Sequence, residues 1–210
     1  MNDYINNLQW RYATKKFDSS KKLTEEQLNF ILDAVQLSAS SYGLQPYHVF
    51  VISDREIREK LKAASWGQVQ ITESSHLIVF ANQTTFKDNL IDDYLTNVIS
   101  TRNLPENSLQ EYGDFMKSKL TPLTDEIKNI WTSKQTYLAL GNLLSAAASI
   151  QVDACPMEGF DAEEYNNILG LSDKNLNASV IATIGFRSEN DETQHYKKVR
   201  KSKDNLFTQL

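Results

Sequence analysis

Two clusters of cationic side chains carry the clearest chemistry in this sequence of 210 residues. The first lies in Arg11-Tyr12-Ala13-Thr14-Lys15-Lys16-Phe17, where three cations occur within six residues beside aromatic rings. The second, Lys197-Lys198-Val199-Arg200-Lys201, lies near the far end of the chain. An arginine can hold a phosphate through two parallel hydrogen bonds, and a lysine adds a point charge. If the clusters meet in the fold, they can neutralise a dianionic phosphate; if they do not, both are solvated surface.

Other reactive side chains are few. The single cysteine, Cys155, excludes an internal disulfide and a cysteine-built metal site. It follows Val152 in an apolar segment, which favours a small core residue over a nucleophile. The histidines His48, His76 and His195 are not at metal-ligand spacing. No phosphate-loop, GxGxxG, HExxH or GxSxG motif occurs, so we predict no metal site and none of the common hydrolytic or phosphoryl-transfer machinery.

Two polar segments could line a ligand site. Ser38-Ala39-Ser40-Ser41-Tyr42-Gly43-Leu44-Gln45-Pro46 is rich in short hydroxyls, and it is either a plain connector or one wall of a polar site. In Trp66-Gly67-Gln68-Val69-Gln70-Ile71 two amides are separated by one apolar residue. An extended backbone would put Gln68 and Gln70 on the same side, facing either a ligand or solvent.

The stretch from Thr124 to Gly159 is expected to organise the fold. Thr124 can cap a long helix, in which the apolar residues from Tyr137 to Ile150 cover the whole circumference. A helix that is apolar all round is buried. At ~1.5 Å per residue it would be roughly 40 Å long, which is more than a domain of this size needs. We therefore expect part of this helix to be buried against a second copy of the chain.

The remaining patterns predict a mixture of helices and strands. Thr24 and Ser53 each open a capping box before a helix. A polar region from about Phe86 to Met116 predicts two amphipathic helices, whose Tyr112 and Phe115 are either core residues or a lid over a pocket. The other predicted elements are a helix from Asn2 to about Trp10, strands at Tyr47–Ile52, His76–Ala81, Val152–Cys155 and Ala178–Phe186, a turn at Pro156–Gly159, and a helix at Asp161–Leu169 closed by Gly170.

Composition indicates one domain over residues 1–210, because no linker, repeat or low-complexity tract divides the chain. The net charge is -5, and neither basic cluster accompanies a recognition helix or a base-stacking motif, so nucleic acid is a poor fit as a partner. The apolar run of the long helix is interrupted and too short for a bilayer, so no membrane partner is expected. With no hydrophobic leader before Tyr4, we expect a cytoplasmic protein.

Six segments occur together in a specific order: RYATKKF, SASSYGLQPY, WGQVQITESSHLIVF, KQTYLALGNLLSAAAS, PMEGF and KKVRK. This set resembles the FMN-dependent nitroreductase family, above all its oxygen-insensitive NAD(P)H nitroreductases and dihydropteridine reductases. The likeness is weakest from about Thr84 to Thr121. It implies an α+β nitroreductase-like fold, with a mostly antiparallel central sheet flanked by helices and a long buried central helix. It also implies an intertwined homodimer, in which the C-terminal segment of each subunit reaches onto the other.

The resemblance implies two FMN sites at the dimer interface. Arg11, Lys198 and Arg200 match the residues that hold the phosphate, and Lys15 matches the lysine near flavin N1. The backbone N–H groups after Met157 match those that face N5 and O4. The full implied set for the cofactor is Arg11, Tyr12, Ala13, Lys15, Ser40, Ser41, Gly43, Gln45, Gln68, Gln70, Pro156, Met157, Glu158, Gly159, Lys198 and Arg200, with Ser40 and Ser41 contributed by the partner subunit. Tyr42, Tyr112 and Phe115 are the expected substrate contacts.

Three positions depart from the family pattern. Ala13 and Gly43 stand where a serine and an asparagine are common, and Gln70 stands where close relatives often have a second lysine near N1. A fixed cation stabilises the negative charge of reduced flavin, and a neutral amide does so less. We therefore predict that FMN in this protein is harder to reduce than in relatives with two lysines.

The implied function is that of an FMN-dependent NAD(P)H oxidoreductase. It would reduce nitroaromatics, quinones or related flat acceptors by ping-pong hydride transfer through flavin N5, with NADH or NADPH as co-substrate. Lys15 and the backbone of Glu158 would tune the flavin, and no side-chain acid or base is needed. One alternative is an FMN-binding protein with a regulatory or storage role and little turnover. Another is an interaction domain whose basic clusters grip an acidic partner.

Overall fold

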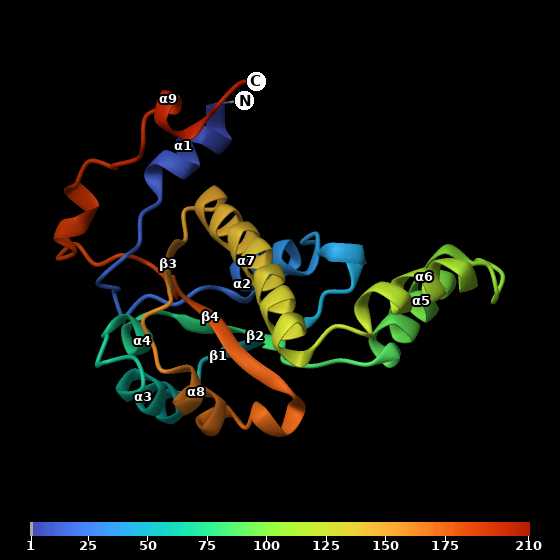
Figure 1. The fold of residues 1–210 in the computed structure, drawn as a ribbon. Coiled ribbons are helices and arrows are strands. Elements are labelled where there is room, and N and C mark those ends of the chain that lie inside the picture. Colours follow the sequence, from blue (N-terminus) through green and yellow to red (C-terminus); the bar gives the residue numbers. More distant parts are fainter. Residues whose placement is uncertain (1) are drawn as a thin grey trace.

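The computed structural model describes residues 2–210 and shows a central antiparallel sheet covered by helices (Figure 1). Its four strands lie in the order β1-β2-β4-β3, and every neighbouring pair is antiparallel. The strands are β1 (Tyr47–Ile52), β2 (His76–Gln83), β3 (Asp153–Met157) and β4 (Leu176–Gly185). The antiparallel central sheet that the resemblance implied is therefore confirmed.

The strand patterns explain the positions of the strands in the sheet. β2 and β4 are nearly unbroken apolar runs, and they take the two central positions, where both faces are covered. β3 continues two residues beyond its predicted end, so Pro156 and Met157 belong to the strand and not to the turn. A proline has no N–H to donate, and it is tolerated here because β3 is an edge strand.

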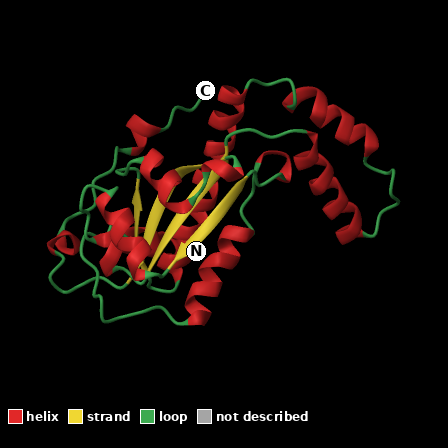
Figure 2. Ribbon diagram, turned by 90° about the horizontal axis from the view of Figure 1, so that it is seen from below, coloured by secondary structure: helices red, strands yellow, loops and turns green. Residues whose placement is uncertain are grey.

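Helices cover both faces of the sheet (Figure 2). One face packs against α2 (Glu25–Gln36) and the long helix α7 (Asp125–Ser149), with Ile31, Phe80 and Leu143 fully buried between them. The other face packs against the remaining helices of the body, with Tyr165 and Ile181 in its core. These helices are α3 (Arg55–Ala63), α4 (Gln70–Glu73) and α8 (Ala162–Leu169).

α7 is buried on one side only. Thr124 caps it as predicted, accepting a hydrogen bond from the Ile127 N–H at 3.3 Å. The expectation that the helix is buried all round is wrong within one chain, since Leu138 is 51% exposed and Ile127, Ile130 and Tyr137 are also exposed. The physical reason is that the sheet covers one face of α7 and leaves the opposite apolar face open.

A helical arm projects from the body (Figures 1 and 2). It consists of α5 (Asp88–Arg102) and α6 (Gln110–Leu120), as the sequence predicted. Asn103 ends α5 in a left-handed conformation with φ 53°. Leu95 and Met116 pack with Leu44 and Leu120 in a third apolar cluster at the base of the arm.

The chain ends overlap in the view of Figure 1 but lie apart in that of Figure 2. The first helix is α1 (Asn2–Trp10), and the last is the short α9 (Lys203–Leu206). Three-residue and four-residue 3-10 turns occur at Ser41–Gly43, Ser172–Lys174 and Glu192–His195. Among the helices described in residues 2–210, none has the length and apolar character that a membrane span requires.

Two predicted capping boxes have different outcomes. The box at Thr24 is confirmed, because Gln27 N donates to Thr24 Oγ1 at 3.2 Å and Thr24 N donates to Gln27 Oε1 at 3.1 Å. The box at Ser53 is wrong by one residue. Asp54 caps α3 instead, accepting from Ile57 N at 2.8 Å, and a carboxylate also suits the positive end of a helix.

Candidate functional site

The two basic clusters meet in one pocket of about 430 Å³. Arg11 directly follows α1, while Lys198 and Arg200 come from the C-terminal segment that passes beside it. Tyr12, Ala13 and Pro156 complete the part of the lining that the sequence singled out. The pocket therefore joins segments that are almost the whole chain apart in sequence.

The cations of this pocket are crowded and lack an anionic partner. Burial and the charge of Arg200 lower the pKa of Arg11, and its Nε is buried without a hydrogen-bond partner in residues 2–210. Burial, Arg11 and Arg200 likewise lower the pKa of Lys198. Within the described chain no ion pair includes any of the three. A bound dianion would relieve this repulsion and satisfy the orphaned donor.

Lys198 is also held in place by backbone oxygens. Its Nζ donates to the carbonyl of Leu8 at 2.5 Å and to the carbonyl of Arg11. Because these carbonyls belong to the last turn of α1 and the residue after it, the C-terminal segment is tied to the first cluster. The carbonyl dipoles also favour the charged form of the lysine without neutralising it.

Asp191 anchors the first cluster, and sequence reasoning missed it. Its carboxylate is 1% exposed and accepts from the backbone N–H groups of Lys15 at 2.8 Å and Lys16 at 3.1 Å, and from the Tyr12 hydroxyl at 3.0 Å. Burial alone would raise the pKa of Asp191, but hydrogen bonds from Thr193 and from the Lys16 and Lys15 backbone lower it overall. The sequence showed Asp191 only as one of several acids in a polar loop, with no local signal of this role.

A second anchor joins Asp153 to Arg187. Arg187 Nε donates to Asp153 Oδ1 at 2.8 Å, and the backbone N–H of Arg187 donates to Oδ2 at 2.8 Å. The guanidinium also lies over the rings of Trp10 and Tyr12, 4.3 Å and 4.6 Å from their centroids. One signal could have revealed the pair: Asp153 opens one buried strand and Arg187 follows another, which puts both at the same end of neighbouring antiparallel strands.

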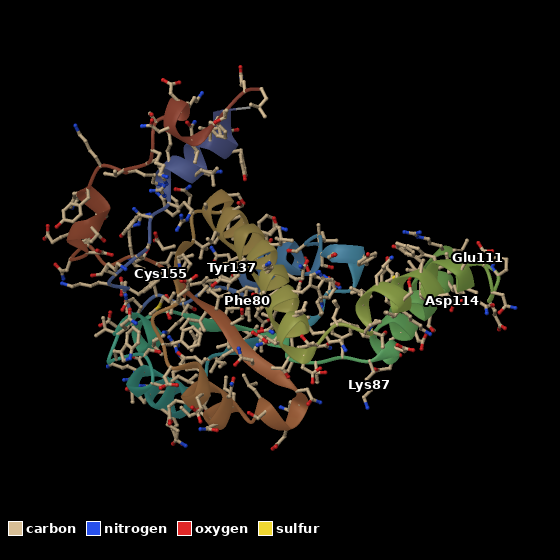
Figure 3. All side chains as sticks on the ribbon, viewed as in Figure 1. Phe80, Lys87, Glu111, Asp114, Tyr137 and Cys155 are labelled. Carbon is tan, nitrogen blue, oxygen red and sulfur yellow. The ribbon has the colours of Figure 1, made fainter. Side chains whose placement is uncertain are left out.

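Lys15 and Arg11 flank Ala13 in sequence, and Ala13 pairs with β3. Burial raises the pKa of the Cys155 thiol, and the charges of Lys15 and Arg11 both oppose that shift. Ala13 pairs with Ala154 in a parallel bridge, which aligns the first cluster along β3. Cys155 itself is buried in the core, as its sequence context predicted (Figure 3).

A second cavity, of about 300 Å³, lies against the turn that follows β3. It is lined by Tyr137 of α7 together with Pro156, Met157 and Glu158. Pro156 also lines the basic pocket, so the two cavities adjoin at this residue. Together they offer a cationic end and an apolar end, which suits a ligand with a phosphate at one end and a flat ring at the other.

The predicted extended segment around Gln68 is wrong. The chain from Trp66 to Val69 forms tight turns, with positive φ at Trp66 and Gly67, and Gln70 begins α4. Gln68 Nε2 donates to the carbonyl of Gly159 at 2.7 Å, whereas Gln70 is only 6% exposed. The two amides therefore have different environments, because a helix start does not alternate side chains as a strand does.

The hydroxyl loop is built tightly but lies elsewhere. Ser41 N donates to Gln135 Oε1 of α7 at 2.8 Å, and Gln45 N donates to Ser40 Oγ at 2.9 Å. Gly43 has φ 77°, and a Cβ there would lie 2.8 Å from the Tyr94 hydroxyl. A side chain at position 43 would therefore require Tyr94 to move.

The structure thus brings together only part of the expected site. The lining of the basic pocket takes no residue from Ser40–Gln45 among those the structure describes. Tyr112 and Phe115 are exposed on α6, in the arm whose Glu111 and Asp114 project away from Tyr137 and Cys155 in Figure 3. One chain alone therefore supplies the phosphate end of the expected site but neither the hydroxyl loop nor the arm aromatics.

Comparison with known proteins gives a consistent result. The family model described as the nitroreductase family matches residues 8–186. A Staphylococcus saprophyticus protein named provisionally as an NAD(P)H nitroreductase is 37% identical over 210 residues, covering 96% of this chain and 94% of that protein. YfkO of Bacillus subtilis, named in the same way, is 36% identical over 189 residues, covering 85% of this chain and 86% of YfkO.

Solved structures share the fold. YdfN of Bacillus subtilis, provisionally named a nitroreductase, matches with a TM-score of 0.89 at 23% identity, and the match covers 100% of both chains. A similarly named protein of Exiguobacterium sibiricum, solved in complex with FMN, matches with a TM-score of 0.84 at 18% identity, covering 99% of this chain and 97% of that one. At these identities the likeness establishes the fold alone.

Proposed function

The chain belongs to the nitroreductase family, and we propose that it is an FMN-dependent oxidoreductase that uses NADH or NADPH to reduce flat acceptors. We expect nitroaromatics and quinones to be its acceptor classes. The names of the relatives, which specify NAD(P)H, support the proposed co-substrate. The FMN bound in the Exiguobacterium structure supports FMN as the proposed cofactor.

One observation carries the proposal: Arg11, Lys198 and Arg200 converge without an anionic partner in residues 2–210, and Arg11 Nε is left unsatisfied. This arrangement is unfavourable unless an anion binds, because three cations repel one another and a buried donor lacks its hydrogen bond. The residues present therefore fit the phosphate of FMN. Tyr12 and Ala13 also line the pocket, and because Ala13 has no hydroxyl, their backbone N–H groups would supply the hydrogen bond to the phosphate there.

The residues around the second cavity suit the flavin ring of FMN. When bound, FMN accepts hydride from the nicotinamide nucleotide and passes it to the acceptor. Lys15 would lie near the edge where negative charge develops, and a fixed cation there favours the reduced form. The turn at Glu158 and Gly159 presents backbone donors beside the cavity, and Pro156 and Met157 form an apolar wall that excludes water.

We further propose that two copies of the chain form the complete site. The exposed apolar face of α7 supports a homodimer, because association would bury Leu138 and the neighbouring apolar residues away from water. A second copy would also supply the hydroxyl loop at Ser40 and Ser41 and the aromatics Tyr112 and Phe115. Among the residues that the structure describes, none of these four lines the basic pocket of its own chain.

The decisive test combines a visible absorbance spectrum with steady-state rates. Purified protein incubated with FMN and desalted should be yellow, and it should oxidise NADH or NADPH in the presence of a quinone or a nitroaromatic compound. Arg11→Ala should lose the yellow colour on desalting, whereas Lys21→Ala, which removes an exposed lysine paired with Asp18, should keep it. Yellow protein without nucleotide oxidation would instead favour a regulatory or storage role, and colourless protein would contradict the proposal.

A further inference from the structure

Trp66 is a bulky aromatic residue held on the surface in an unfavourable conformation. Its φ is 55°, and 74% of the residue is exposed. Left-handed backbone is costly for a bulky residue, and an exposed indole leaves a large apolar surface in water. Glycine or asparagine would adopt the same turn at lower cost. The stability of the fold therefore does not explain a tryptophan at this position.

The indole of Trp66 lies directly over Gly159. A Cβ added to Gly159 would come within 2.9 Å of Trp66 Cζ3 and 3.5 Å of Cε3. The ring is thus in contact with the turn after β3, at the residue that follows Glu158 of the second cavity's lining. Most of the surface of Trp66 remains open to solvent.

Hydrogen bonds fix the Trp66 segment to that turn. Asp161 N donates to the Ala64 carbonyl at 2.8 Å, and Gln68 Nε2 donates to the Gly159 carbonyl at 2.7 Å. These bonds flank Trp66 on both sides in sequence. The segment that carries Trp66 is therefore tied to the turn on both sides of the tryptophan.

We propose that Trp66 is a specificity-determining residue, whose indole forms one wall of the place where the acceptor lies beside the turn at Glu158 and Gly159. This inference rests on the proposed function and deepens it, since it names fused-ring acceptors as the preferred class. A two-ring acceptor has a second ring that can extend over the indole, and aromatic pairs gain stabilisation beyond the area they bury. A one-ring acceptor of the same chemistry lacks this contact.

The first test compares 1,4-naphthoquinone with 1,4-benzoquinone as acceptors for the FMN-loaded enzyme. Trp66→Gly should lower kcat/KM for naphthoquinone by about tenfold and that for benzoquinone by less than about threefold. Trp66→Phe keeps an aromatic wall and should stay within about threefold of wild type for both. Trp66→Gly also removes the unfavourable φ, so its Tm should equal or exceed that of wild type, which separates the effect from unfolding.

The matched control is Asn175→Gly, which places glycine at another left-handed position, with φ 54°, on the turn before β4. It should leave the naphthoquinone to benzoquinone ratio unchanged. A second measurement, equilibrium dialysis of each quinone against FMN-loaded protein without nucleotide, should show the same tenfold loss for Trp66→Gly with naphthoquinone. Equal ratios in wild type and Trp66→Gly, or no naphthoquinone binding to wild type, would overturn the inference. Failure to oxidise NADH or NADPH would contradict the proposed function, and the dialysis would still decide the role of Trp66.

Discussion

The hydroxyl of Tyr137 donates to Oε1 of Glu158 at 2.6 Å, and this bond joins the long helix α7 to the turn after β3. Both residues line the cavity that Pro156 shares with the basic pocket. The bond therefore fixes the distance between the helix that carries the exposed apolar face and the turn that faces the proposed flavin ring. Its chemistry is testable, because a phenol that donates to a carboxylate resists ionisation.

Tyr137→Phe should remove a late-titrating phenol. Burial, the bond to Glu158 and the charge of Glu158 raise the pKa of Tyr137 to about 12. A phenol in the unfolded chain ionises near pH ~10, so this contribution to stability is fully present below that pH and is lost as the pH rises through about 12. Ultraviolet absorbance during an alkaline titration should show one tyrosinate fewer in the late phase. Identical late phases in both proteins would contradict the assignment.

Arg200→Gln should weaken FMN more than riboflavin. Riboflavin lacks the phosphate, so its affinity does not depend on the crowded cations of the basic pocket. Loss of one charge-assisted hydrogen bond corresponds to about 1.5–3 kcal/mol, which is roughly a tenfold to hundredfold rise in the Kd of FMN. The Kd of riboflavin, measured by flavin fluorescence, should change by less than about threefold.

Arg200→Gln should not destabilise the cofactor-free protein. Arg200 lowers the pKa of both Arg11 and Lys198, so its charge opposes theirs when no anion is bound. Chemical denaturation at low salt should give Arg200→Gln a free energy of unfolding equal to or above that of wild type. An equal loss of FMN and riboflavin affinity, or a clear loss of stability, would show that Arg200 acts structurally and not on the phosphate.

Asp191→Asn should destabilise the protein and detach the first basic cluster. An asparagine keeps one acceptor oxygen, and its NH₂ group would face the N–H donors that the second oxygen now accepts. We expect a loss of about 2–4 kcal/mol in the free energy of unfolding at neutral pH. Asp204→Asn, a change to an exposed carboxylate in the C-terminal segment, should have little effect.

The difference in unfolding free energy between wild type and Asp191→Asn should depend on pH in a defined direction. Hydrogen bonds hold the pKa of folded Asp191 below its ordinary value. Its contribution to stability is therefore present above the unfolded pKa of about 3.9 and is lost as the pH falls through the lower folded pKa. The gap in unfolding free energy between wild type and Asp191→Asn should narrow under acid conditions. A gap that is independent of pH would indicate that the charge of Asp191 contributes little.

Elements whose signals are local could be predicted from the sequence. The caps at Thr24 and Thr124 and the stop at Gly170 depend on residues within one turn of the helix end, and all three are confirmed. The central strands β2 and β4 could be predicted because an unbroken apolar run needs cover on both faces. The identity of these elements therefore followed from pattern, while some boundaries, such as that of β3 at Met157, did not.

The anchors of the site could not be predicted, because they join residues that are distant in sequence. The Asp191 carboxylate accepts a hydrogen bond from the backbone N–H of Lys15, although the two residues are 176 positions apart in sequence. Nothing near Asp191 in the sequence distinguishes it from the other acids of its loop. The backbone conformation around Gln68 could not be predicted from the sequence either. The polar and apolar alternation there resembles a strand, but positive φ at Trp66 and Gly67 turns the chain instead. Backbone of this kind is selected by tertiary contacts with Gly159 and not by propensity.

Gln70→Lys should raise the midpoint potential of bound FMN. Gln70 is 6% exposed at the start of α4, so a lysine there would be largely removed from water, and its charge would be weakly screened. A cation near the flavin favours the reduced, anionic form, and ~1–3 kcal/mol of added stabilisation corresponds to about 20–60 mV for a two-electron couple. Thr72→Lys places the same charge two residues along α4 and should move the midpoint less. A redox titration of the three proteins checks this; a midpoint that does not rise in Gln70→Lys refutes the prediction that the neutral amide makes FMN harder to reduce.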